Sequence, residues 1–429
     1  MYRLITTKST VLGLYWLMSA AGAVYGQEPT SENSDPAPLV LDMRAGATAE
    51  PAPESALIRE YQQTIAATEA RAGAYAPDLP EQLLALGTAL QALNRHEEAI
   101  EVLKRGAHLA RIHTGLYTRE QLALVRAELR SHLALGDYQQ VDNRQRYLYR
   151  VEREALAYNE ESAFALLRHA DWQRQAYLVG VGEEETLPAR LLWMWDLYRL
   201  SLTEMIDYFG EEAPELREPL LGMIKAQYLI AGHQGFDPSR SRNTNGPVYV
   251  TKTNDAFRKG SAVLTALVDL SEANEQPLAQ IGADKLALGD WAWWFEKRPE
   301  AQLYYDELQT AIAESEDPEA QQWLADTLAQ PAPVPMLEGI EALPAPLWDD
   351  SGALVISFTV TDTGRVTDIE RIREPDVEED ETAISRLLRT LRDTRFRPRF
   401  EDGLPATTET IVWSWPPAAW RDERLAMNP

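Results

Sequence analysis

Residues Pro80 to Ala110 read PEQLLALGTALQALNRHEEAIEVLKRGAHLA, and this stretch decides the predicted fold. Its apolar residues recur at helical spacing in two successive runs. Leu83 and Gly87 share one face of the first predicted helix, and Ala99 and Leu103 share one face of the second. Small residues at such positions let two antiparallel helices approach closely, while large residues fill the gap. The stretch therefore predicts a helix hairpin.

A second copy of this pattern lies far along the chain, at Gly282 to Ala313. Gly289 precedes Ala301 by the same twelve residues that separate the glycine and the alanine of the first hairpin, and Tyr305 stands where a leucine stood. A weaker third copy spans Leu122 to Leu148. These positions resemble the tetratricopeptide repeat, a helix hairpin that stacks into arrays. The resemblance implies a helical array that presents a groove to partner proteins.

The five residues LALGD occur at Leu133 to Asp137 and again at Leu286 to Asp290. In the third copy, Gly136 and Asp137 supply the turn between the helices, and Val141 takes the small position. In the second copy the same letters fall in a different phase of the repeat. We therefore interpret this identity as a coincidence and not as an alignment of the repeats.

The first residues predict export. Arg3 and Lys8 form a positive n-region, and the apolar run Val11 to Met18 is followed by small residues. Such a segment is typical of a secretory signal peptide, here with cleavage after Ala23 or Gly26. The run falls short of the ~20 apolar residues that a bilayer span needs, so we expect a periplasmic protein without a stable membrane span. The alternative is an uncleaved N-terminus that anchors the chain in the inner membrane.

Shifts in composition divide the rest of the chain. The stretch after the signal is rich in Pro, Ser and Glu and cannot bury enough apolar surface to become ordered. A second Pro-rich stretch, QPAPVPMLEGIEALPAP, separates a helical texture from a strand texture. The irregular piece 235–253 fits either a functional loop or an ordinary surface insertion. The predicted domains are a signal peptide (1–26), a disordered linker (27–55), a helical-repeat domain (56–329), a Pro-rich linker (330–346), a C-terminal domain (347–417) and a tail (418–429).

In the C-terminal domain the hydrophobic period changes from 3.6 to 2, which is typical of strands. Leu354 to Val360 alternates as a half-buried strand, and a tight turn at Gly364 leads into a second strand whose alternation slips, which suggests a bulge. Glu378 to Asp393 has one apolar face and acidic residues at its start, as a helix would. Thr407 to Trp415 is rich in β-branched and aromatic residues and predicts a last strand. The predicted order is ββαβ.

Four short motifs mark this domain: Phe358-Thr359-Val360, Gly364-Arg365-Val366, Arg395-Phe396-Arg397-Pro398 and Asp402-Gly403. Together and in this order they resemble the C-terminal domain of the TonB family, over about Leu347 to Pro416. The resemblance implies a small domain that binds outer-membrane transporters by pairing an edge strand with an extended segment of the partner. The chain departs from the energy-transducing members, because a cleavable signal replaces their anchor and helical repeats replace their long Pro-rich arm.

The last predicted strand is the candidate partner-binding site. A final strand in a ββαβ arrangement has no later partner, so we expect one backbone edge to stay unpaired. Its hydrophobic side chains must face the helix that carries Leu387 and Leu391, which leaves recognition to the backbone edge. The candidate residues are Thr407, Thr408, Glu409, Thr410, Ile411, Val412 and Trp413.

No catalytic, cofactor or metal motif stands out in the sequence. The six histidines show no H-E-x-x-H spacing, and the chain has no cysteine. A formal net charge of -26 disfavours nucleic acid as a partner. The prediction is therefore a protein without enzymatic activity, without a cofactor and without a metal.

Two groups of side chains leave alternatives open. Tryptophans such as Trp193, Trp291 and Trp294 fit either core packing, which their helical spacing favours, or stacking on envelope glycans. Four arginines near the predicted strands form either a solvated face, which alternation favours, or a basic patch. They are Arg365, Arg395, Arg397 and Arg399.

As a whole, the sequence predicts an α+β multidomain protein, in which an all-α tetratricopeptide-like helical array precedes a small ββαβ domain similar to the TonB C-terminal domain. The predicted function is a non-enzymatic periplasmic protein-protein interaction scaffold. Its expected partners are envelope proteins, such as an outer-membrane transporter or receptor. Two alternatives remain: an energy-transducing TonB-type partner of outer-membrane transporters, and an envelope enzyme or glycan-binding protein.

Overall fold

The structure is a computed structural model, and it describes residues 54–183, 186–233, 255–347, 354–373 and 381–416. The predicted signal peptide, nearly all of the linker after it, the piece 235–253 and the tail 418–429 lie outside these ranges. Within the described ranges, no helix has the length and apolarity that crossing a membrane requires. Contacts divide the chain into two compact units that meet between Trp172 and Gln173.

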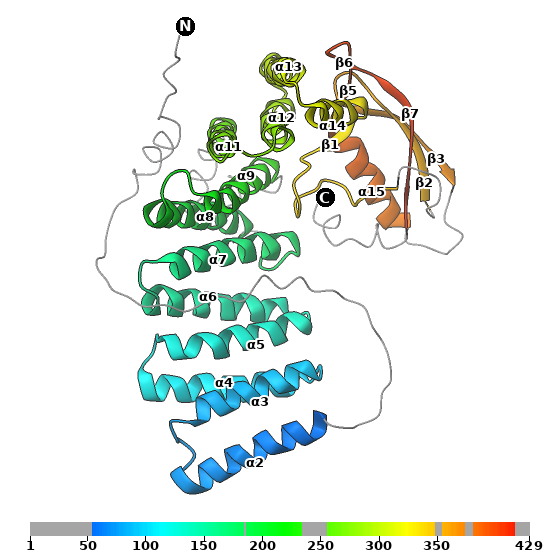
Figure 1. Cartoon of the computed structure of the whole chain (residues 1–429). Coiled ribbons are helices and arrows are strands. Elements are labelled where there is room, and N and C mark those ends of the chain that lie inside the picture. Colours follow the sequence, from blue (N-terminus) through cyan, green and yellow to red (C-terminus); the bar gives the residue numbers. More distant parts are fainter. Residues whose placement is uncertain (1–53, 184–185, 234–254, 348–353, 374–380, 417–429) are drawn as a thin grey trace. The chain divides into compact units, whose positions relative to one another are not determined.

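The first unit consists of helix hairpins (Figure 1). Helix α7 (Glu160–Leu178) begins in this unit and ends in the next. Consecutive helices pack together from α2 to α6. The helices before α7 are α2 (Glu54–Ala72), α3 (Leu79–Ala92), α4 (His96–Thr114), α5 (Leu122–Ala134) and α6 (Tyr138–Ala155), with a short 3-10 helix (Arg119–Gln121) before α5.

Hairpin α3–α4 has the close helix crossing that its sequence predicts. A Cβ atom added at Gly87 would lie 2.5 Å from Leu103 Cδ2, so a larger side chain would displace that leucine. Ala99, the predicted small position of α4, is fully buried. The predicted register of this hairpin is confirmed.

The first LALGD stretch forms the turn between α5 and α6, as predicted. Gly136 adopts a φ of 68°, which favours glycine. The Asp137 carboxylate accepts a hydrogen bond from the backbone N–H of Gln140 at 3.3 Å and so caps α6. Val141, the predicted small position, is fully buried.

The second unit continues with helices and ends in a small mixed module of strands and one helix. Its first helices use the same close crossings as hairpin α3–α4. A Cβ atom at Gly222 would lie 2.2 Å from the Tyr198 ring, and one at Gly260 would lie 2.1 Å from the Trp291 ring. Its helices after α7 are α8 (Leu187–Phe209), α9 (Arg217–Gly232), α11 (Ala256–Ala273), α12 (Leu278–Trp294), α13 (Arg298–Glu314) and α14 (Pro318–Ala329).

Hairpin α12–α13 has the same close helix crossing at a glycine as α3–α4, with one change. A Cβ atom at Gly289 would lie 2.3 Å from Cε1 of Tyr305, and Ala301 is fully buried, so the predicted register is confirmed. The second LALGD stretch lies inside α12, which agrees with its predicted difference in phase. The change is that a tyrosine with a polar tip occupies the place of Leu103.

The C-terminal module has a three-stranded antiparallel sheet in the order β3-β2-β7. Helix α15 lies against one face of this sheet (Figure 1), and its leucines share a core with the strand side chains. The predicted bulge is present in the β2–β3 pair, where the register shifts and Asp368 has a φ of 51°. The elements are β2 (Leu354–Val360), β3 (Val366–Arg373), α15 (Glu381–Asp393), β4 (Arg395–Arg397), β5 (Arg399–Glu401), β6 (Leu404–Ala406) and β7 (Thr408–Trp415).

The Pro-rich stretch 330–346 is built into this module, which corrects its prediction as a linker. Its residues Ala332–Val334 form strand β1, which pairs with β4, and Val334 is 1% exposed. The Pro344 carbonyl accepts a hydrogen bond from Trp415 Nε1 at 3.1 Å. Proline is compatible with short edge strands, and the apolar residues between these prolines find a core to enter. The two compact units accordingly divide at Trp172 and not at this stretch.

Candidate binding sites

Strand β7 is an edge strand of the three-stranded sheet. One side of β7 pairs with β2 in an antiparallel register. On the other side, Leu347 and Ser414 exchange two backbone hydrogen bonds of 2.9 Å each. Leu347 therefore closes the outer edge at the C-terminal end of β7.

The outer edge is open nearer the start of β7. Ser414 directs its N–H and C=O outward, and peptide groups two residues apart in a strand point the same way, so Val412 directs its own outward too. In the part of the chain that the structure describes, no backbone group pairs with Thr408 to Val412 on this side. A bulge lies in this open part, where Thr410 has a φ of 58°.

The seven predicted edge residues differ in what they expose. Thr407 precedes β7, and its hydroxyl and carbonyl oxygens accept hydrogen bonds from Asp362 N and Arg399 Nε, both at 3.1 Å. Ile411 and Trp413 are buried in the core formed with α15, as predicted. The open edge consequently spans Thr408 to Val412, five of the seven candidate residues.

Arg397, from the motif that resembles the TonB family, is buried and not part of a solvated face. It is 2% exposed, and its Nη1 donates to Asp290 Oδ2 at 2.8 Å. The Tyr305 hydroxyl donates to the other carboxylate oxygen of Asp290 at 2.9 Å. The favoured interpretation of the four arginines is therefore wrong for Arg397. Alternation along a strand identifies two faces, but it does not reveal that a helix covers one of them.

Further contacts join the module to hairpin α12–α13. Trp293 Nε1 donates to the Phe396 carbonyl at 2.7 Å, and Gln302 Nε2 donates to the Gly403 carbonyl at 3.1 Å. Gly364 has a φ of 73°, and a Cβ atom there would lie 2.0 Å from the Phe396 oxygen. The glycine of the second family-like motif thus permits a close approach between the β2–β3 turn and β4.

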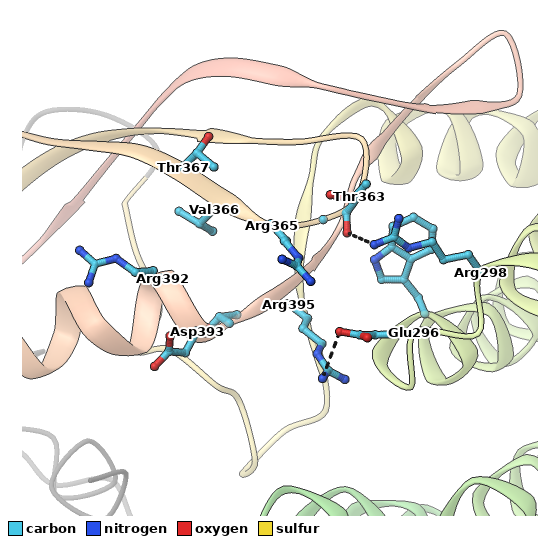
Figure 2. A pocket seen from close by; sticks show the side chains of 12 residues that line it. Glu296, Arg298, Thr363, Arg365, Val366, Thr367, Arg392, Asp393 and Arg395 are labelled. Atoms are coloured by element: carbon cyan, nitrogen blue, oxygen red, sulfur yellow. Dashed lines mark hydrogen bonds and ion pairs between the residues drawn. The ribbon is translucent and has the colours of Figure 1, made fainter.

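Next to this junction lies a cleft of about 440 Å³, which we name the arginine cleft (Figure 2). The end of α12, the β2–β3 turn and the end of α15 enclose it. Two acidic side chains, Glu296 and Asp393, also line it. The arginines that line it are Arg298, Arg365, Arg392 and Arg395.

Two of these arginines have contacts that orient them. The Arg298 guanidinium lies 5.7 Å from the centroid of the Trp293 ring, and the Arg395 guanidinium lies 3.6 Å from Glu296. Arg365 is exposed and points from the β2–β3 turn toward Arg395 and Glu296 (Figure 2). Arg392 lies on the last turn of α15, at the other side of the cleft.

A buried ionic group in the first unit surrounds Glu152. Burial, the largest single cause, raises the pKa of Glu152. The hydrogen bond and charge of His169 and the charge of Arg126 together lower the pKa by more, so it lies below its ordinary value. These partners satisfy the carboxylate, which fits a structural role. In the described residues, no group of three or more His, Asp or Glu side chains could hold a metal ion.

Among known proteins, the chain has a likeness to a solved TPR-like repeat structure. No protein-family model matches the chain, and no curated protein matches it either. Solved structures with some likeness include the nearly identical TPR-like repeats of a kinesin light chain candidate from Podospora anserina. That structure is 13% identical, covers 56% of this chain and 96% of its own, and has a TM-score of 0.36. Because the score is so low, the fold rests on the helix crossings described above.

Proposed function

We propose that the chain is an exported scaffold for protein interactions, and that the open edge of β7 binds an extended segment of a partner. The observation that carries this proposal is the outward peptide group of Val412, beside the outer edge that Leu347 already pairs at Ser414. A backbone edge of this kind supplies hydrogen bonds to an added strand, and flanking side chains supply selectivity.

The likeness of the module to the TonB C-terminal domain supports strand addition as its mode of binding. The four motifs that carry the likeness include Gly364 and Arg397, and both have structural roles where the module meets α12. We infer from the same likeness that the partners are envelope proteins, such as outer-membrane transporters or receptors.

The buried contacts between the module and hairpin α12–α13 favour a scaffold over a moving energy transducer. Breaking a buried ion pair such as Arg397–Asp290 is costly, because one charge stays buried without a partner. Hairpin α12–α13 would then hold the β7 edge in a fixed orientation, and the helices would offer their own faces to further partners. We propose a binding role without catalysis, a cofactor or a metal.

The proposed location is the periplasm, on the basis of the positive n-region, the short apolar run and the small residues before Gln27. N-terminal sequencing of the chain from fractionated cells tests this location. We expect a product that begins near Gln27 in the periplasmic fraction. A chain that keeps Met1 in the membrane fraction would contradict export with cleavage and would favour the transducer alternative.

Site-specific photo-crosslinking tests the binding edge in cells. Glu409 is exposed at the open edge, and Ser385 is exposed on α15, which is not part of that edge. A photoreactive amino acid at position 409 should capture a distinct partner, whereas the same residue at position 385 should not. Equal capture from both positions, or from neither, would contradict a binding role for the β7 edge.

A further inference from the structure

The arginine cleft is unusual because the chain around it is strongly acidic. The whole chain has 67 acidic and 41 basic residues, yet four arginines and only two acidic residues line this cleft. Arginines gathered in one cleft repel one another, and an anionic ligand between them would offset this repulsion.

Only one of the two acidic residues neutralises an arginine here. Glu296 pairs with Arg395 at 3.6 Å, and the Arg298 guanidinium faces the Trp293 ring and donates to the Thr363 carbonyl at 3.5 Å. In the described ranges, Arg365 and Arg392 have no acidic side chain within ion-pair distance. Among the described residues, three arginines therefore line the cleft without an ion pair to a carboxylate: Arg298 on α13, Arg365 on the β2–β3 turn and Arg392 on α15.

The backbone around the cleft is firmly held. The Phe396 N–H donates to the Gly364 carbonyl at 2.9 Å, and the Gly364 N–H donates to the Thr361 carbonyl at 2.8 Å. The Arg365 N–H donates to the Thr361 hydroxyl at 3.1 Å. Arg365 thus extends from a turn that is fixed to β4, and β4 is in turn anchored on α12. A site built on rigid elements is suited to binding a small ligand.

We propose that the arginine cleft binds a phosphoryl group, carried either by a soluble phosphate ester or by a phosphorylated lipid. A phosphoryl group has about -1.5 to -2 charges at pH 7 and three strong acceptor oxygens, which matches several guanidinium groups better than one carboxylate does. The volume of about 440 Å³ is that of a compact ligand with room for an organic part. This site is separate from the β7 edge, and its test does not depend on the proposed protein partner.

Calorimetric titration of the full chain with inorganic phosphate, at constant ionic strength, tests the proposal. We expect saturable binding of phosphate, and we expect Arg365→Glu to weaken it at least tenfold. Arg392→Glu should weaken it less, because Arg392 lies across the cleft from the other three arginines (Figure 2). Arg389→Glu is the matched control, since Arg389 is exposed on the same helix but does not line the cleft. Its affinity should equal that of the unaltered chain. Melting temperatures verify folding, and Arg365→Gln serves as a second variant if Arg365→Glu is unstable.

Sedimentation with phosphatidylcholine vesicles, with and without phosphatidic acid, distinguishes the two sources of the phosphoryl group. Co-sedimentation that needs phosphatidic acid and Arg365 supports the lipid, and phosphate binding without co-sedimentation supports the soluble ester. The proposal is overturned if phosphate shows no saturable binding or if Arg389→Glu weakens binding as much as Arg365→Glu. It is also overturned if an aspartate-rich peptide binds through Arg365 more tightly than phosphate, because the cleft would then recognise an acidic protein segment.

Discussion

The two LALGD stretches have identical letters and opposite structural roles. In the first, Gly136 forms a turn with a φ of 68° and Asp137 caps α6 at the surface. In the second, Gly289 lies within α12 against Tyr305, and Asp290 is buried between Tyr305 and Arg397. The position of the stretch within the hairpin therefore decides whether its aspartate caps a helix, as Asp137 does, or links a helix to the C-terminal module, as Asp290 does.

The hairpins themselves extend this comparison. Hairpin α3–α4 closes its crossing with Leu103, which is purely apolar, whereas hairpin α12–α13 closes its crossing with Tyr305. The Tyr305 hydroxyl helps to hold the Asp290 carboxylate that receives Arg397 from the C-terminal module. Hairpin α12–α13 therefore has the same close helix crossing as α3–α4, and it also has polar side chains that bind the C-terminal module.

The largest expected effect comes from removing the second aspartate. Asp290→Ala leaves the Arg397 charge buried without its partner, and we expect a loss of about 3–5 kcal/mol in the free energy of unfolding. Asp137→Ala removes only a cap and should cost about 1 kcal/mol. Urea unfolding of both variants measures the contrast. The double variant Asp290→Leu with Arg397→Met should recover much of the stability that Asp290→Ala loses, because neither charge is then buried. Equal losses for Asp290→Ala and Asp137→Ala would mean that the buried ion pair does not hold the module.

Larger side chains at the buried alanines of the two hairpins test whether both hairpins use the same close helix crossing. Ala99→Leu and Ala301→Leu should each overpack a crossing and cost about 1–3 kcal/mol. Ala311→Leu is a matched control because Ala311 is exposed on α13, and its melting temperature should stay near that of the unaltered chain. Unchanged melting temperatures for the two buried positions would contradict the hairpin register.

The smallest effect on stability is expected for Tyr305→Phe, which removes the hydroxyl that distinguishes the two crossings. Losing its hydrogen bond to Asp290 should cost about 1 kcal/mol near pH 7. Burial, followed by the nearby Asp290 carboxylate, raises the pKa of Tyr305 well above its ordinary value of 10.0. Its stability contribution is therefore complete below pH 10 and is lost as the pH rises above that value. Denaturation at pH 8 and pH 11 should show a smaller alkaline loss for Tyr305→Phe, and equal alkaline losses would exclude this role.

The sequence predicts the local elements well because their signals lie within short windows. The hairpin register, strands β2, β3 and β7, the amphipathic helix with Leu387 and Leu391, and the inward direction of Ile411 and Trp413 all follow from periodicity. These features needed no knowledge of distant contacts.

Features that depend on distant partners were missed. The burial of Arg397 depends on Asp290, which is 107 residues away in the chain. The pairing of β1 with β4 inside the predicted linker also joins distant segments. Thr410 adopts a positive φ although threonine is β-branched, so its own residue type gave no sign of the bulge. The alternative of a basic patch included Arg365 and Arg395 of the arginine cleft, but it did not include Arg298 and Arg392, because the lining comes from three separate segments.

Binding by a Val412→Pro variant tests the central claim, strand addition at the open β7 edge, most directly. Proline removes the outward amide of Val412 but leaves the hydrogen bonds between β7 and β2 intact. Thr410 is unsuitable for this substitution because its φ of 58° is incompatible with proline. We expect the partner captured through position 409 to bind Val412→Pro at least about tenfold more weakly, since one buried acceptor stays unpaired and the ring obstructs the added strand. Val412→Thr, which keeps the amide, should bind normally. Undiminished binding by a Val412→Pro variant that melts like the unaltered chain would contradict the claim.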